Sequence, residues 1–377
     1  MTEYPISEYA RALRSHLPTP LFAPAPGRAL WLLVHVAVIA VGVAAIAWHW
    51  GGWPGRIAFS LLIGHSFAGG AFVAHEALHG SIVRSRRARQ AIGWLGFLPF
   101  GISPTLWVAW HNRVHHGHTA QSGVDPDTYP TLAKYRQSRA VRVVDRLSIG
   151  GGRWAGLVTL FLGFSAQSAI ALGQCRTALG MSAGQTRAAI AHTVAALALW
   201  GSIGLLIGLP AFVFAFVVPL MIGNAVVMAY ILTNHSLSPL TTVNDPLLNS
   251  LSVTAPRVIE TLHLDFGFHV EHHLFPAMSP RHAREVREVV RSMWPERYQS
   301  MPLWRALRLL WITPRVYENA TTLYHPRRGD RMQTLLPRRP QRRTPSVTAP
   351  EWPRRPHAAL VPERAQRTRR IAPRNTT

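Results

Sequence analysis

The chain has 377 residues, of which 48% are hydrophobic and 15% charged, and its mean hydropathy is +0.09. A soluble domain carries about 25% charged residues, so this composition excludes a disordered chain, a coiled coil and most soluble enzymes. The single cysteine, Cys175, excludes a disulfide framework and, within one chain, an iron–sulfur cluster or a thiolate zinc finger. The net charge of +23 is concentrated at the edges, because residues 326–377 hold 14 Arg against three acidic residues. We therefore expect a membrane protein with basic edges and no nucleic-acid partner.

Long runs without Asp, Glu, Lys or Arg predict the membrane spans. A helix needs about 20 residues to cross the hydrocarbon core of a bilayer. Two uncharged runs near the N-terminus meet this length, and a later run of 47 residues is long enough to cross twice, with Pro210 near its middle. The expected spans are 29–50, 57–74, 188–209 and 211–233. They form two helical hairpins.

Two further apolar segments, 91–110 and 154–175, are expected to stay at the membrane periphery. The first contains Pro99 and Pro104, which favour a segment that dips into the membrane and returns. The second carries several polar residues and is expected to lie on the surface. This assignment places every histidine cluster on one side of the membrane. The predicted fold is an all-α integral membrane protein with four spans and a cytoplasmic helical cap that carries the histidines.

The distribution of arginine predicts the orientation. Arg84, Arg86, Arg87 and Arg89 follow the second span, whereas the turn between the first two spans holds only Arg56. The positive-inside rule then places both termini and the histidine clusters in the cytoplasm. The expected parts of the chain are a cytoplasmic segment (1–28), a membrane domain with the metal site (29–325) and a disordered Arg/Pro-rich tail (326–377).

Most of the conspicuous histidines stand in three short clusters, of the form H-x₃-H, H-x₃-HH and H-x₂-HH, and one more lies at the end of the fourth span. Residues four apart share a helix face, so neighbouring imidazoles of one cluster can point at one metal centre. Ionisable residues at a membrane boundary are costly and usually functional. The candidate metal ligands are His75, His79, His111, His115, His116, His235, His269, His272 and His273.

Several polar residues beside these histidines are candidates for orienting them. Metal-bound imidazoles usually donate their second N–H to a carboxylate or carbonyl. We expect Glu76, Asn234, Asp265 and Glu271 to take this part. Asp125 and Asp127 have either the same role or a structural one.

Two other classes of protein have to be weighed against a two-metal enzyme. His75-Glu76-x-x-His79 also matches the zinc-peptidase pattern, in which Glu is the general base. A zinc peptidase site needs three protein ligands, and the other histidines would have no purpose. A non-catalytic membrane scaffold would not need clustered ligands at all.

The order and separation of the three clusters resemble the histidine boxes of the membrane fatty acid desaturase family, from about residue 29 to residue 291. Further similar detail lies in His115-His116-Gly-His-Thr119, in Asp125-Pro-Asp127 and in 271–276, Glu-His-His-Leu-Phe-Pro. The resemblance implies a non-haem diiron centre whose ligands are the eight box histidines and His235. The third box opens with His269 where many lipid-linked desaturases have Gln, which leaves the substrate class open.

The resemblance implies an oxidoreductase that inserts a double bond into a fatty acyl chain, with O₂ and two electrons. A ferredoxin or a cytochrome-type protein would supply the electrons, since no fused redox domain is recognisable in the sequence. Trp107, Phe72 and Phe268 are candidates for lining the acyl tunnel, or are ordinary packing residues.

Related diiron enzymes with the same ligand set remain alternatives: a lipid hydroxylase, an acetylenase or a carotenoid ketolase. Chain length and bond position are open. So is the acyl carrier, which is coenzyme A, a carrier protein or a glycerolipid, with the 271–276 segment favouring a lipid.

Overall fold

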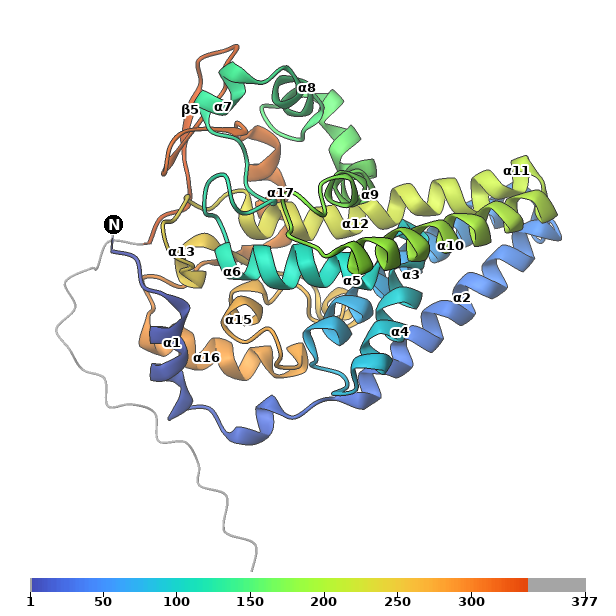
Figure 1. Cartoon of the computed structure of the whole chain (residues 1–377), viewed down its shortest axis with the longest axis horizontal. Coiled ribbons are helices and arrows are strands. Elements are labelled where there is room, and N and C mark those ends of the chain that lie inside the picture. Colours follow the sequence, from blue (N-terminus) through green and yellow to red (C-terminus); the bar gives the residue numbers. More distant parts are fainter. Residues whose placement is uncertain (1, 338–377) are drawn as a thin grey trace, which may run out of the picture. The chain divides into compact units, whose positions relative to one another are not determined.

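The computed structural model describes residues 2–337, which are mostly helical. Four long helices correspond to the predicted spans: α2 (Leu30–Ala47), α3 (Gly52–His79), α10 (Ala183–Ile207) and α12 (Val218–His235). In Figure 1 they run toward the same end, where α11 (Leu209–Phe212) and η6 (Val213–Val217) lead into α12. The shorter elements gather around the other end, where α3 and α12 finish.

The remaining helices connect and cover this bundle. They are α1 (Ile6–Arg14), η1 (Thr19–Phe22), η2 (Pro26–Ala29), α4 (Arg86–Phe97), η3 (Leu98–Phe100), α5 (Pro104–Trp107), η4 (Val108–His115), α6 (His116–His118), α7 (Leu132–Gln137), α8 (Arg139–Leu147), η5 (Trp154–Gly156), α9 (Leu157–Gly173), α13 (Pro246–Asn249), α14 (Arg257–Leu262), α15 (His269–Leu274), η7 (Pro280–His282), α16 (Ala283–Met293) and α17 (Leu303–Ile312).

Five helical stretches are long and apolar enough to cross a membrane, one more than the sequence predicts. They are Thr19–Ala47, Gly52–His79, Trp154–Gly173, Ala183–Ile207 and Leu209–His235. The additional stretch is the segment expected on the surface, which forms η5 and α9. The segment expected to dip and return is bent by 100° between Arg86–Phe100 and Pro104–His118. The chain therefore has the apolar helices of a membrane protein.

Two small sheets correct the prediction of an all-α fold. β1 (Ser252–Thr254) pairs in parallel with β2 (Ser300–Pro302), while β3 (Val316–Asn319), β4 (Thr322–Tyr324) and β5 (Arg331–Gln333) form an antiparallel sheet. Strands of three or four residues are too short to give a recognisable alternating pattern.

The third strand of the antiparallel sheet also corrects the predicted start of the disordered tail at residue 326. β5 is ordered because its backbone pairs with β4, and Arg331 makes an ion pair with Glu318 on β3 at 2.7 Å. Residues 338–377 of the predicted tail lie outside the described residues.

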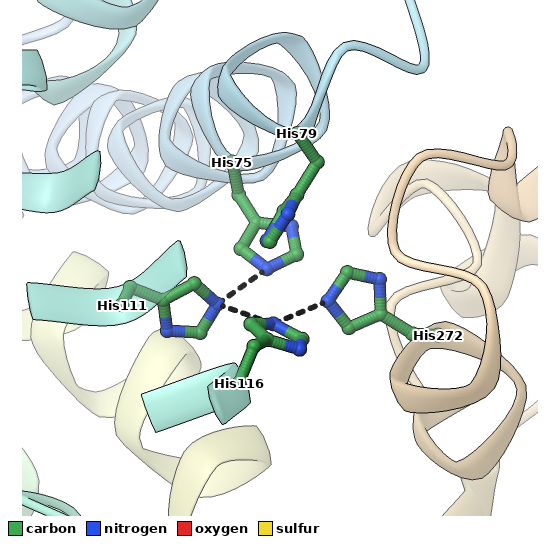
Figure 2. A group of neighbouring side chains, drawn as sticks. All are labelled: His75, His79, His111, His116 and His272. Atoms are coloured by element: carbon green, nitrogen blue, oxygen red, sulfur yellow. Dashed lines mark hydrogen bonds between the residues drawn. The ribbon is translucent and has the colours of Figure 1, made fainter. Parts of the chain in front are cut away.

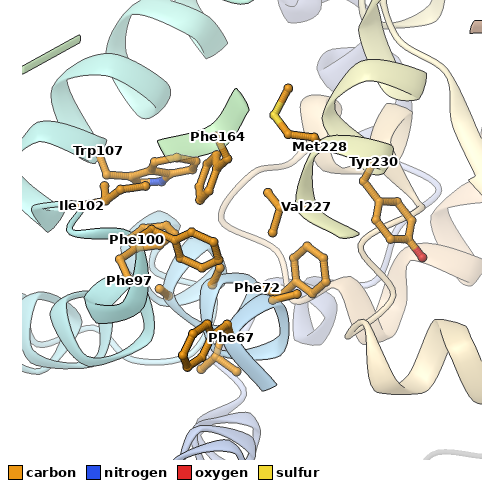
Figure 3. Close-up of a cluster of buried hydrophobic side chains, with 14 of the residues drawn as sticks. Phe67, Phe72, Phe97, Phe100, Ile102, Trp107, Phe164, Val227, Met228 and Tyr230 are labelled. Atoms are coloured by element: carbon orange, nitrogen blue, oxygen red, sulfur yellow. The ribbon is translucent and has the colours of Figure 1, made fainter. Parts of the chain in front are cut away.

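Buried aromatic side chains from α3, the α4–α5 segment, α9 and α12 pack against one another (Figure 3). Trp107 packs on Phe97 with ring centroids 4.7 Å apart, and Phe164 of α9 packs on Phe100 at 5.1 Å. The approach of α4 to α3 requires glycine, because a Cβ on Gly96 would lie 2.2 Å from a backbone oxygen of α3. This core fixes the helix ends that carry the candidate ligands.

Candidate metal centre

His75 and His79 occupy the last turns of α3, four residues apart on one face. The helix ends immediately afterwards at Gly80, whose φ of +88° is easily adopted only by glycine. Both imidazoles therefore project from the end of a buried helix toward the same point, as the sequence pattern predicts (Figure 2).

The second cluster lies on a π-helical segment, η4, which runs into α6. The wider winding of a π-helix changes which residues share a face. His111 and His116 meet, with their Nε2 atoms 3.1 Å apart, whereas His115, whose ring stacks on that of His111, groups with histidines of other segments. The histidines of the H-x₃-HH cluster thus belong to two different sets of imidazoles, which the spacing of the cluster alone does not reveal.

The third cluster lies on α15 and meets the end of α12. His269 Nε2 is 2.7 Å from His235 Nε2 and 3.1 Å from His273 Nε2. His272 points the other way, toward His116, at 3.1 Å between Nε2 atoms. The histidines of this cluster therefore also belong to two different sets of imidazoles.

The nine candidate ligands form two all-histidine groups, and in each group the ring nitrogens lie within 4.8 Å of one another. A third set, His111, His115 and the carboxylate of Asp127, meets the same distance and links the two groups. The first histidine group is His75, His79, His111, His116 and His272. The second histidine group is His115, His235, His269 and His273. Figure 2 shows the first group, with side chains from α3, η4, α6 and α15 converging on one point.

The arrangement of nitrogens fits metal binding better than hydrogen bonding. His111 Nε2 lies 3.1 Å from both His75 Nε2 and His116 Nε2. A neutral imidazole nitrogen carries either one proton or one lone pair, so it cannot satisfy several converging neighbours. His79 Nε2 is also buried without a partner among residues 2–337. A cation between the rings would satisfy all of these lone pairs together.

Burial keeps the three imidazoles of α15 in the form that binds metals. Burial lowers the pKa of His269, His272 and His273, and neighbouring imidazoles lower it further. These side chains are therefore neutral at pH 7, as metal ligation requires.

Three members of the second histidine group are oriented through their Nδ1 atoms. His115 Nδ1 lies 2.9 Å from Asp125 Oδ1, and His235 Nδ1 lies 3.2 Å from the carbonyl oxygen of Asn249. His273 Nδ1 is 3.3 Å from Thr119 Oγ1. A proton on Nδ1 of His115 and His235 leaves the Nε2 lone pair facing the group.

The sequence suggested only some of the residues that hydrogen-bond to these Nδ1 atoms. Burial raises the pKa of Asp125, but the charge and hydrogen bond of His115 outweigh it and lower this pKa, so the carboxylate is ionised. Thr119 belongs to the His-His-Gly-His-Thr phrase and could have been found there. Asn249 gives no local signal, because the loop after α12 brings it back to His235.

Glu76 and Asp265 do not orient imidazoles as predicted, because both carboxylates face Arg28. Arg28 Nε donates to Glu76 Oε2 at 2.8 Å, and its Nη1 lies 3.7 Å from Asp265 Oδ2. This arginine also donates to the carbonyl oxygen of Leu264 at 2.8 Å. The engagement of Glu76 with Arg28 leaves no support for a zinc-peptidase base at this position.

Glu271 has a similar anchoring role on the third cluster. Its carboxylate accepts hydrogen bonds from Arg287 Nε at 3.1 Å, from Tyr298 Oη at 2.5 Å and from Ser252 Oγ at 2.6 Å. The carboxylate is buried and makes no hydrogen bond to an imidazole among the described residues. Asn234 is buried too, and its amide has no partner within residues 2–337. Neither residue therefore makes the predicted orienting contact to an imidazole among the described residues.

A narrow, mostly apolar cavity adjoins both histidine groups. Its lining includes Phe72, Trp107 and Phe164 beside His75 and His269. Phe72 and Trp107 were candidates from the sequence. Phe268 was also a candidate but lies beneath the guanidinium of Arg287, 3.9 Å from its ring centroid, and does not line the cavity.

Comparison with known proteins gives two findings. The sequence model described as fatty acid desaturase matches residues 51–305. The chain is also 25% identical over 318 residues to the sn-1 acyl-lipid omega-3 desaturase (ferredoxin) of Synechocystis sp. (strain ATCC 27184 / PCC 6803 / Kazusa). That alignment covers 78% of this chain and 84% of the relative. The residues that match the family model, 51–305, include all nine candidate ligands.

The ion pair between Arg28 and Glu76 gives a stability prediction. Their side chains are 13% and 2% exposed. Arg28→Met should destabilise the protein by about 3 kcal/mol, because it leaves a buried carboxylate without its partner. The double variant with Glu76→Gln should recover most of this loss. Thermal unfolding in detergent measures both, with Arg86→Met, at an exposed arginine, as the control. Equal losses in the single and double variants would contradict the prediction.

Proposed function

The chain belongs to the fatty acid desaturase family and is an oxidoreductase, and from this premise we propose that it inserts a double bond into an acyl chain of a membrane lipid. The reaction consumes O₂ and two electrons and releases water. We further propose that the nine histidines hold two iron ions, one in each histidine group. The observation that carries this proposal is the convergence of nine buried or half-buried imidazoles on two points.

Iron suits the proposed site better than zinc. Imidazole binds both metals, but zinc has no redox chemistry. When bound, the iron pair supplies the oxidising power, drawn from O₂, that removes hydrogen from an unactivated methylene. The chain's own contribution is to present Nε2 atoms at two fixed points. Asp125 and the Asn249 carbonyl hold the rings of His115 and His235 in that orientation.

The cavity beside the two histidine groups is suited to an acyl chain. Phe72, Trp107 and Phe164 give it apolar walls, and His75 and His269 border it. Apolar walls exclude water and restrict the chain, so that one part of it is held near the metal ligands. The cavity lies between α3, α9 and α12, whose exposed apolar surfaces face lipid in the proposed orientation. A membrane lipid is therefore the proposed substrate, consistent with the acyl-lipid substrate in the name of the Synechocystis relative.

We propose that electrons enter through the first histidine group from a ferredoxin-type or cytochrome-type protein. His79 and His116 are half-buried, whereas the other seven candidate ligands are buried. Arg113 is exposed beside them, and Arg89 lies next to Gly80, 3.2 Å from the position of a Cβ there. An acidic carrier protein would be attracted to this basic rim. The name of the relative, which includes ferredoxin, favours the first kind of donor.

The finer topology that we propose has four spans, with the metal centre and both termini in the cytoplasm. In this proposal both ends of α9 lie on the side of the histidines. Its beginning contacts α17 through the Trp154–Trp311 pair, at 5.2 Å between ring centroids. After its end a compact turn leads directly to α10, and Arg113, next to the second cluster, donates to the Leu179 carbonyl in that turn. A helix that begins and ends on one side lies along the membrane surface.

Metal content tests the ligand assignment. Purified protein should contain about two iron ions per chain. His79→Ala in the first histidine group and His235→Ala in the second should each lower this content. The control is His118→Ala. His118 is exposed, and among the described side chains its ring hydrogen-bonds only to Gln121. One zinc ion per chain, lost with His79→Ala and retained with His235→Ala, would contradict the proposal.

Lipid analysis tests the reaction. Expression in a host that lacks the activity should yield acyl chains with one additional double bond, detected by gas chromatography and mass spectrometry. His235→Ala should abolish the product and His118→Ala should leave it unchanged. A hydroxylated, acetylenic or ketolated product would assign the chain to one of the other diiron reactions.

Cysteine labelling tests the topology. In a Cys175→Ser background, Ala155→Cys and Thr177→Cys flank α9, and Trp50→Cys marks the tip of the first hairpin. The first two should react with a membrane-impermeant maleimide from the same side, and Trp50→Cys from the opposite side. Labelling of the two flanking positions from opposite sides would show that α9 crosses the membrane.

A further inference from the structure

Buried polar atoms without hydrogen-bond partners mark a second site in the described part of the chain. Such atoms are found in the histidine groups, for example on His79 and His115. They recur together in the loop before η5 and in the β3–β4 hairpin, where Arg153, Arg315 and His325 contribute six of them. The histidine groups present lone pairs, which suit a cation. The second cluster presents N–H donors, which suit an anion.

The backbone brings these three basic side chains together. Val316 pairs with Tyr324, so Arg315 and His325 stand opposite each other at the end of the hairpin. The adjoining loop has glycine at the two positions that face Arg315 and His325. A Cβ on Gly150 would lie 2.6 Å from Arg315 Cδ, and one on Gly151 would lie 2.8 Å from His325 Cδ2.

The guanidinium of Arg315 is a buried charge without a balancing contact. The residue is 3% exposed, and its Nε, Nη1 and Nη2 have no acceptor among residues 2–337. The guanidinium lies over Tyr129, 3.7 Å from the ring centroid. The nearby carboxylate of Asp145 already accepts from Arg153 Nη2 at 3.4 Å. Arg315 makes no ion pair with Asp145 among the described residues, and an unpaired buried charge is strongly destabilising.

His325 adds a further donor. Its Nδ1 accepts hydrogen bonds from the backbone N–H groups of Arg327 and Arg328, both at 3.3 Å. Burial lowers the pKa of His325, and Arg328 and Arg153 lower it further. In the neutral ring the proton must therefore be on Nε2, which is buried without a partner among the described residues.

We propose that Arg153, Arg315 and His325 form a binding site for the phosphate group of an anionic membrane lipid. Arginine forks match the oxygens of a phosphate, and the three side chains offer donors but no acceptor to it. An oxyanion would satisfy these donors and neutralise the excess positive charge.

The surroundings place this site at the level of lipid headgroups. Trp154, which follows Arg153, is 77% exposed and packs edge-on against Trp311. Tryptophan is enriched at membrane–water interfaces. Val143 and Val144 of α8 are also exposed apolar side chains nearby in the chain. A lipid phosphate is therefore a more suitable occupant than a phosphate ion from solution.

Thermal unfolding of the full-length protein in detergent tests the proposal without any assay of desaturation. The wild type should be stabilised by phosphatidylglycerol in mixed micelles, more than by phosphatidylcholine or by inorganic phosphate. Arg315→Met and Arg153→Met should each lose most of this shift, whereas Arg146→Met, at an exposed position on α8, should keep it. Without added lipid, Arg315→Met should unfold at the wild-type temperature or higher, because it removes an unbalanced buried charge.

Three outcomes would overturn the proposal. They are an equal phosphatidylglycerol shift in the wild type and in both arginine variants, an equal effect of inorganic phosphate and lipid, and a loss of stability in lipid-free Arg315→Met. The last would mean that Arg315 is balanced within the chain itself. Arg153→Met gives an independent reading if Arg315→Met does not fold. The result is separate from the proposed reaction, since an inactive or metal-free protein gives the same lipid response.

Discussion

The convergence of nine imidazoles on two points is the constraint on which the arrangement of the other elements depends. Each ring must direct one nitrogen lone pair inward, and each must be kept from protonation in a site that excludes water. The ligands come from α3, η4, α6, α12 and α15, so the ends of five elements have to be fixed together. Packing alone does not select a tautomer. Hydrogen bonds at Nδ1, such as those of His115 and His235, supply that selection.

Two buried ion pairs hold the histidine-bearing segments from outside. Arg28 binds Glu76, the neighbour of His75, and Arg287 binds Glu271, the neighbour of His272. Each glutamate is next to a candidate ligand in sequence but points in a different direction, because successive residues on a helix are rotated by about 100°. The N-terminal segment and α16 are thereby attached to the first and third clusters. These carboxylates position the ligands through the backbone and not through the imidazole rings.

Opposite chemistry governs two of the places in the described part of the chain where buried polar atoms lack partners. In the histidine groups the lone pairs converge, and the chain needs a cation to make the arrangement stable. Around Arg315 the N–H donors converge, and an anion would have the same effect. Gly150 and Gly151 make the second arrangement possible, because a side chain at either position would collide with the basic residues. Both arrangements follow from one physical rule, that buried polar groups need partners.

The sequence by itself determined the helical membrane character, the four apolar runs and all nine histidines that meet in the structure. These follow from local patterns, since run length, charge and cluster spacing can be read along the chain. Only the tertiary structure decided how the histidines divide, because the positions of α12 and α15 determine which imidazoles His115 joins. It also decided the partners of Glu76 and Glu271. Arg28 and Arg287 lie 48 and 16 residues away from these glutamates in sequence, so no local pattern links them. The strand β5 and the cluster around Arg315 depend on pairing between segments, which no local pattern specifies.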